Sequence, residues 1–99
     1  MVSAAFIPQW VNTVIDMIRN NADVGAILRI PNAIQIADAN QYIAENQRPR
    51  QGDWYEYASF FHGATLNVVF INGIWWNVMF DRRDNFISYE QYRYINMRV

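Results

Sequence analysis

The chain contains no cysteine and no lysine, and His62 is its one histidine. The lack of cysteine excludes disulfides and thiolate metal sites, and a single histidine is too little for a typical zinc site. The four glycines are isolated from one another, so the sequence has no glycine-rich phosphate loop. No apolar run approaches the ~18–20 residues of a membrane helix, and the N-terminus lacks the basic start of a signal peptide. We expect a cytoplasmic protein that carries no cofactor and does not enter a membrane.

The composition is typical of one folded domain over residues 1–99. Hydrophobic residues make up 53% of the chain and aromatic residues 16%, which is well above the composition of a disordered protein. The net charge of −1 provides no overall field that would attract nucleic acid. All eight basic residues are arginines. Codon bias is one explanation, and a surface selected for bidentate contacts with a partner is another.

Asn72-Gly73 lies between two apolar runs and is the strongest local signal in the sequence. Both residues of a type I′ hairpin turn need positive φ, so strands are predicted over residues 65–71 and 74–80. Neither face of this hairpin is polar, whereas a small antiparallel sheet normally has one polar face. The first face carries Thr65, Val69, Ile71, Ile74, Trp76, Val78 and Phe80, and the second carries Leu66, Val68, Phe70, Trp75 and Met79. Each of these apolar faces must be buried against another packed segment, from this chain or from a partner.

An amphipathic helix is predicted between Ile7 and Ile18, because apolar residues recur there with helical spacing. Pro8 suits its first position, and Asn20-Asn21 suits its end. The stripe consists of Ile7, Trp10, Val11, Val14, Ile15 and Ile18. This face is expected to pack on the sheet.

The segment between this helix and the hairpin is harder to assign. Residues 25–30 fit either a short strand or the end of a turn, and Pro31 ends this apolar run. Residues 32–47 show both strand-like and helical spacing, and we expect a helix over about residues 38–46, where good helix formers are frequent.

Two further strands complete the predicted sheet. In residues 54–61, strict alternation would place Trp54, Glu56, Ala58 and Phe60 on one face and Tyr55, Tyr57, Ser59 and Phe61 on the other. Residues 86–99 fit a final strand, with a short helix over residues 88–92 as the alternative. We therefore predict an α+β fold in which an N-terminal helix and a second short helix pack on one face of a four- to five-stranded antiparallel meander.

The remaining apolar face is covered either by the helix around residues 38–46 or by another protein chain, and the second alternative favours a non-enzymatic protein–protein interaction module. Under this hypothesis the chain self-associates as a homo-oligomer or docks on a larger protein, for example as a viral inhibitor or assembly factor. Tyrosine, tryptophan and arginine are the residues enriched at binding hot spots. The predicted partner-binding residues are Trp54, Tyr55, Tyr57, Trp75, Trp76, Tyr92 and Tyr94, with Arg82 and Arg83 at the rim.

Two other functions remain open. Glu56 lies between two tyrosines, and either Glu56 or His62 could be the polar group of an aromatic pocket in a small-ligand-binding domain or minimal enzyme. Ser59 and Asp53 are the available partners of His62 for nucleophilic chemistry, but the sequence does not place them together. A basic patch near Trp54 and Tyr55 could instead bind single-stranded nucleic acid, although the acidic balance of the chain argues against it. That patch would consist of Arg48, Arg50, Arg82 and Arg83.

Overall fold

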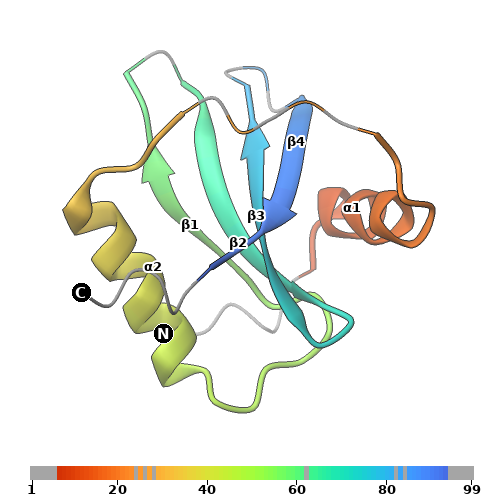
Figure 1. Cartoon of the computed structure of the whole chain (residues 1–99), viewed down its shortest axis with the longest axis horizontal. Coiled ribbons are helices and arrows are strands. Elements are labelled where there is room, and N and C mark those ends of the chain that lie inside the picture. Colours follow the sequence, from red (N-terminus) through yellow and green to blue (C-terminus); the bar gives the residue numbers. More distant parts are fainter. Residues whose placement is uncertain are drawn as a thin grey trace.

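In a computed structural model the described part of the chain forms two helices and a four-stranded antiparallel sheet (Figure 1). The structure describes residues 7–23, 25, 27, 29–61, 63–81, 83 and 85–93. Each strand pairs with the next one in the chain, in the order β1-β2-β3-β4. The elements are α1 (Gln9–Arg19), α2 (Ala33–Glu45), β1 (Trp54–Ser59), β2 (Thr65–Ile71), β3 (Ile74–Phe80) and β4 (Phe86–Gln91). The predicted α+β fold is confirmed.

The hairpin at Asn72-Gly73 forms as predicted. Asn72 has a φ of 53° and Gly73 a φ of 83°, which are the positive values that this turn requires. Ile71 pairs with Ile74, and the register of β2 against β3 continues without a bulge along both strands. The two faces of the hairpin therefore carry the two residue sets expected from the sequence.

Each face of the sheet is covered by one helix of the chain itself, so the sheet lies between α1 and α2 (Figure 1). Val11 and Val14 of α1 pack with Val69 and Val78 on one face. On the other face, α2 packs over a second core cluster. That cluster includes Ala39, Tyr42, Ile43, Leu66, Val68 and Met79.

The prediction that both helices share one face is therefore wrong, and of the two covers considered for the second face, the second helix and another chain, α2 is the one observed. The connection between Arg19 and Ala33 carries the chain from one side of the sheet to the other (Figure 1). Hydrophobic spacing shows that a helix has an apolar side, but it does not show which apolar face of a sheet that side meets.

Local capping explains where the helices begin and end. Asn20 caps the C-terminal end of α1, and Asn21 follows with a φ of 51°, as the sequence predicted. The second helix starts five residues earlier than expected, at Ala33. Asn32 and Gln35 form a capping box there, in which each side chain accepts a hydrogen bond from the other residue's backbone N–H.

The outer strands depart from the predicted pattern in two places. The register of β1 against β2 shifts between Glu56 and Ala58, so Tyr57 is an extra residue in the strand. Strict alternation holds through Tyr57, which lies on the α2 side with Tyr55, but is wrong from Ala58 onward, because Ala58 lies on that side as well. At the other edge Phe86–Gln91 is a strand, so the alternative helix over residues 88–92 is wrong. The predicted continuation over residues 94–99 lies outside the described residues.

Tyrosine hydroxyls join α2 to the sheet. Tyr55 donates to Asp38 Oδ2 at 2.8 Å, and Tyr92 donates to Asn40 Oδ1 at 2.9 Å. Tyr42 of α2 donates in the opposite direction, to the backbone carbonyl of Trp54 at 3.2 Å. These bonds fix the position of α2 along the sheet and hold the cavity walls described below in place.

Neither described helix has the length and apolar character needed to cross a lipid bilayer.

Candidate functional site

A groove opens on the α1 side of the sheet, where the start of α1 meets the β1 edge. Its volume is about 380 Å³, which is within the range of small-molecule sites. Its aromatic lining comes from three elements and consists of Trp10, Trp54 and Phe80. Its polar lining consists of Gln9, Glu56, Thr65 and Asn67. We call this site the α1 groove.

The aromatic side chains of the α1 groove are held by contacts with one another. Trp10 meets Trp54 edge-to-face, with ring centroids 5.5 Å apart and planes at 80°. Trp10 also meets Phe80 in this way, at 5.0 Å and 72°. Such pairs stabilise each other by about 0.5–1.5 kcal/mol beyond the area they bury. The groove therefore has a preformed aromatic wall, on which both indoles are half-exposed.

Asn67 is the unusual residue of the α1 groove. The residue is 4% exposed, yet its side-chain amide forms no hydrogen bond within the described part of the chain. Among the described residues, Ser88 Oγ is the one polar side-chain atom that is both fully enclosed and without a hydrogen-bond partner. The unpaired atoms of the Asn67 amide are therefore not fully enclosed and keep some contact with solvent. Buried polar groups are normally paired, so an open amide at the base of a groove provides an unused donor and an unused acceptor.

Glu56 lies directly beside Asn67. The two residues are register partners on adjacent strands and share the α1 face. The Glu56 side chain is exposed and takes part in no ion pair or hydrogen bond within the described residues. The groove thus combines one carboxylate, two amides and one hydroxyl with aromatic rings, which is a suitable set for a neutral ligand rich in hydroxyl groups.

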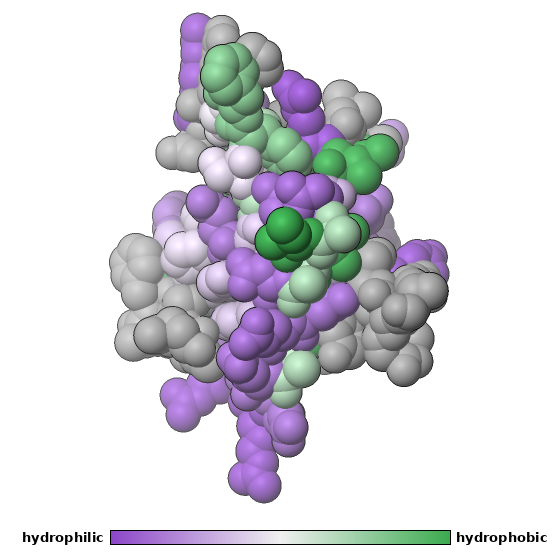
Figure 2. Space-filling view, turned by 90° about the vertical axis from the view of Figure 1, so that its left-hand side faces the viewer, coloured by the Kyte–Doolittle hydropathy of each residue, from purple (hydrophilic) through white to green (hydrophobic). Residues whose placement is uncertain are grey.

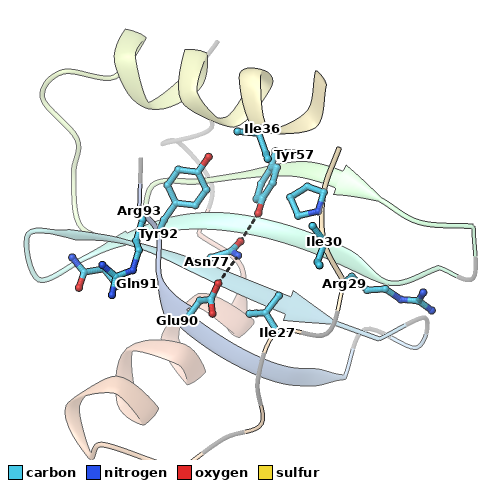
Figure 3. Close-up of a pocket in the computed structure, with 11 residues that line it drawn as sticks. Ile27, Arg29, Ile30, Ile36, Tyr57, Asn77, Glu90, Gln91, Tyr92 and Arg93 are labelled. Atoms are coloured by element: carbon cyan, nitrogen blue, oxygen red, sulfur yellow. Dashed lines mark hydrogen bonds between the residues drawn. The ribbon is translucent and has the colours of Figure 1, made fainter. Parts of the chain in front are cut away.

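A second cavity, of about 370 Å³, lies on the α2 side and is shown in Figure 3. We call it the α2 pocket. The Tyr57 hydroxyl donates to Asn77 Oδ1 at 2.6 Å, and Asn77 Nδ2 makes a long contact of 3.5 Å with Glu90 Oε2. Burial raises the pKa of the Tyr57 hydroxyl above its ordinary value, with Tyr92 and Glu90 adding to the effect. Tyr57 therefore stays protonated and acts as a donor.

The structure separates the predicted partner-binding residues. Trp54 and Trp76 lie on the α1 side, while the other described aromatic members lie on the α2 side, so they do not form one continuous patch. On the α2 side, Tyr57 and Tyr92 are buried. The pKa of Tyr55 is raised by its hydrogen bond to the Asp38 carboxylate. The set on the α2 side is Tyr55, Tyr57, Trp75 and Tyr92, whereas Tyr94 lies outside the described residues.

The predicted basic patch is not assembled either. Arg48 and Arg50 belong to the loop before β1. This loop joins the hairpin-turn end of the sheet, because the Gly52 N–H donates to the Phe70 carbonyl and the Phe70 N–H donates to the Asp53 carbonyl. Arg83 follows β3 at the opposite end. Arg82 lies outside the described residues. The two arginines before β1 and Arg83 are therefore too far apart along the strands to act together.

Of the candidates for nucleophilic chemistry, Asp53 and Ser59 are described, and they lie at opposite ends of β1. Asp53 is buried, and its carboxylate accepts hydrogen bonds from Asn46 Nδ2 at 2.9 Å and from the Arg50 backbone at 3.1 Å. These bonds give Asp53 a structural role in the loop before β1. His62 lies outside the described residues. Among the described residues, no cluster of three or more histidine or carboxylate side chains could hold a metal ion.

Sequence reasoning identified Glu56 but missed Trp10, Asn67, Asn77 and Glu90 as cavity residues. The sequence did contain a signal for two of these residues, because each strand of the hairpin has an asparagine near its middle. Asparagine is depleted in strands, so its presence there indicates a special role. Asn67 and Asn77 fall on opposite faces of the sheet, so each places an amide in one of the two cavities.

No known protein family, curated protein or solved structure matches this chain.

Proposed function

We propose that this protein binds a small, neutral, hydroxyl-rich ligand with an apolar ring face, such as a sugar, in the α1 groove. The observation that carries the proposal is the unpartnered, buried amide of Asn67. The amide keeps some solvent access, so water can pair with it when no ligand is bound. A ligand hydroxyl that replaces this water would form the same hydrogen bonds inside the groove, at a net gain of about 0.5–1.5 kcal/mol each.

The neighbours of Asn67 support the same class of ligand. Glu56, Thr65 and Gln9 provide acceptors and donors around the amide, and the half-exposed indoles of Trp10 and Trp54 provide apolar surface. A sugar ring has hydroxyl groups on its edge and C–H groups on its faces. Both kinds of surface therefore find a complement in the groove.

We propose binding without chemical turnover. Glu56 is the one carboxylate among the residues that line the α1 groove. Glycoside hydrolysis generally uses a pair of carboxylic residues that flank the bond to be cleaved. A single exposed carboxylate is better suited to accept hydrogen bonds from ligand hydroxyls.

Saturation-transfer NMR with methyl glycosides of glucose, galactose and N-acetylglucosamine tests the proposal. At least one glycoside should bind, and Asn67→Leu should weaken its binding about tenfold by removing the amide at similar volume. Glu56→Gln should also weaken binding, while Glu90→Gln on the opposite face is the matched control. Absence of saturation transfer from every glycoside, or equal binding by the wild type and Asn67→Leu, would contradict the proposal.

Association with another protein chain is a second candidate. It is favoured by three large apolar side chains that face solvent, namely Phe61 at 96% exposure, Ile30 at 85% and Ile34 at 81%. Figure 2 shows the side of the molecule covered by α2, where apolar side chains lie among polar ones. In this case the protein would be a cytoplasmic inhibitor or assembly factor, or a homo-oligomer. Light scattering over a concentration series tests self-association, and Phe61→Ser should lower the mass of any oligomer.

A further inference from the structure

The α2 pocket is separate from the α1 groove, because the two cavities lie on opposite faces of the sheet. Its polar floor consists of Tyr57, Asn77 and Glu90, which come from three different strands. Its apolar wall comes from α2 and the segment that precedes it, and consists of Ile27, Ile30, Pro31 and Ile36. Figure 3 shows the floor and this wall facing the same space.

The floor of the α2 pocket is rich in hydrogen-bond acceptors. Tyr57 uses its proton on Asn77, so the Tyr57 oxygen keeps acceptor capacity toward the pocket. Glu90 receives one long contact, from Asn77, and takes part in no ion pair within the described residues. An ionised carboxylate can accept about four hydrogen bonds. Glu90 therefore has most of its acceptor capacity available.

The arginines at the rim do not neutralise Glu90 within the described structure. The Arg29 guanidinium lies over the Phe60 ring, 5.9 Å from its centroid. Figure 3 shows the Arg29 side chain extending away from Glu90. Arg93 lies beside Gln91 at the other side of the pocket and is exposed. Two guanidinium groups and one carboxylate therefore line the α2 pocket, and the exposed Glu90 carboxylate pairs with neither guanidinium within the described residues, so it is available to a ligand cation.

We infer that the α2 pocket binds an organic ammonium ion, with the ammonium group at Glu90 and an apolar body against Ile27, Pro31 and Ile36. An ammonium group supplies three donors and no acceptor, which complements an acceptor-rich floor. A hydrogen bond between two ionised groups is stronger than a neutral one, so the charge on the ligand should decide its affinity. This inference does not depend on the function proposed for the α1 groove.

The test is a titration of the full chain with n-hexylammonium chloride, followed by the amide signals in ¹H–¹⁵N NMR spectra. The neutral control ligand is 1-hexanol, and the anionic control ligand is hexanoate. Hexylammonium should shift the signals of Asn77, Glu90 and the start of α2, and it should bind about tenfold or more tightly than hexanol. Glu90→Gln should reduce hexylammonium binding to the level of hexanol.

Glu56→Gln is the matched control, because it removes a carboxylate from the opposite face of the sheet. It should leave hexylammonium binding unchanged, whereas Glu90→Gln should leave glycoside binding to the α1 groove unchanged. The inference is overturned if hexylammonium does not bind, if hexanol or hexanoate binds equally well, or if Glu90→Gln has no effect. The two variants therefore distinguish failure of this inference from failure of the proposed function.

Discussion

The Tyr57 hydroxyl donates a 2.6 Å hydrogen bond to Oδ1 of Asn77, and both side chains are buried on the α2 side of the sheet. Tyr57 is the extra residue of β1, and Asn77 lies two strands away on β3. The bond therefore crosses over β2 without involving it. It connects the irregular edge of the sheet to its centre and forms the floor of the α2 pocket.

Tyr57→Phe should lower the free energy of unfolding by about 1–3 kcal/mol. The ring keeps its packing against Tyr92, but Asn77 loses its donor in a buried position. Chemical denaturation of the wild type and the variant measures the difference. A variant as stable as the wild type would show that the hydrogen bond does not contribute to stability.

Asn67 and Asn77 should respond in opposite directions to replacement by leucine. Both are buried, at 4% and 6% exposure, but Asn77 has partners and the Asn67 amide has none within the described residues. We expect Asn67→Leu to leave stability unchanged or raise it by up to about 1 kcal/mol, and Asn77→Leu to lower it by about 1–3 kcal/mol. Thermal and urea unfolding of both variants checks this. Loss of stability in Asn67→Leu would indicate that its amide already has a structural partner.

Ser88→Ala should be neutral or stabilising. The Ser88 side chain is fully buried, and its hydroxyl has no hydrogen-bond partner among the described residues. Alanine removes an unsatisfied hydroxyl with a small change in volume, so we expect a gain of about 0–1 kcal/mol. Urea denaturation measures it. A clear loss of stability would mean that the hydroxyl is satisfied in solution.

Gly52→Ala should destabilise the protein more than Gly73→Ala. Both glycines have positive φ, which costs an L-residue about 1–2 kcal/mol, at +91° and +83° respectively. An added Cβ at Gly73 meets nothing within 4 Å, whereas at Gly52 it would lie 3.1 Å from Ile7 Cδ1. Denaturant midpoints of the two variants give the difference.

The double variant Ile7→Ala/Gly52→Ala separates the two causes. Ile7→Ala removes the atom that the new Cβ would crowd, so the additional cost of Gly52→Ala over Gly73→Ala should disappear in the Ile7→Ala background. If the additional cost persists, it comes from the backbone of Gly52 and not from crowding.

Asp81 should make stability depend on pH. Hydrogen bonds from the backbone N–H groups of Asn85 and Arg83 lower the pKa of the Asp81 carboxyl below its ordinary value of 3.8. A depressed folded-state pKa means that the ionised group contributes stability above its ordinary pKa, and that the contribution is lost as the pH falls through the folded value. Asp81→Asn should therefore be less stable than the wild type near neutral pH.

The difference between wild type and Asp81→Asn should shrink as the pH falls below about 4. Melting temperatures of both proteins across this range measure the effect. A difference that is independent of pH would mean that the charge of Asp81 is not involved.

The elements of this fold were largely predictable from local pattern. Asn72-Gly73 specified the hairpin because few residues adopt positive φ, and the alternation on either side specified which residues share a face. The spacing from Ile7 to Ile18 specified α1 for a similar reason. The start of α2 was missed because the capping box of Asn32 and Gln35 was not recognised. The extra residue Tyr57 was missed because a bulge depends on pairing with another strand.

The sequence by itself determined the α+β class, the turn, the helix at the N-terminus and the presence of two apolar sheet faces. These depend on backbone preferences and on contacts between residues close in the chain. Only the tertiary structure decided that α1 and α2 cover opposite faces, that Trp54 meets Trp10, and that one asparagine is paired while the other is open. Those outcomes depend on the path of the connection between the helices and on packing between distant segments, which no local pattern records.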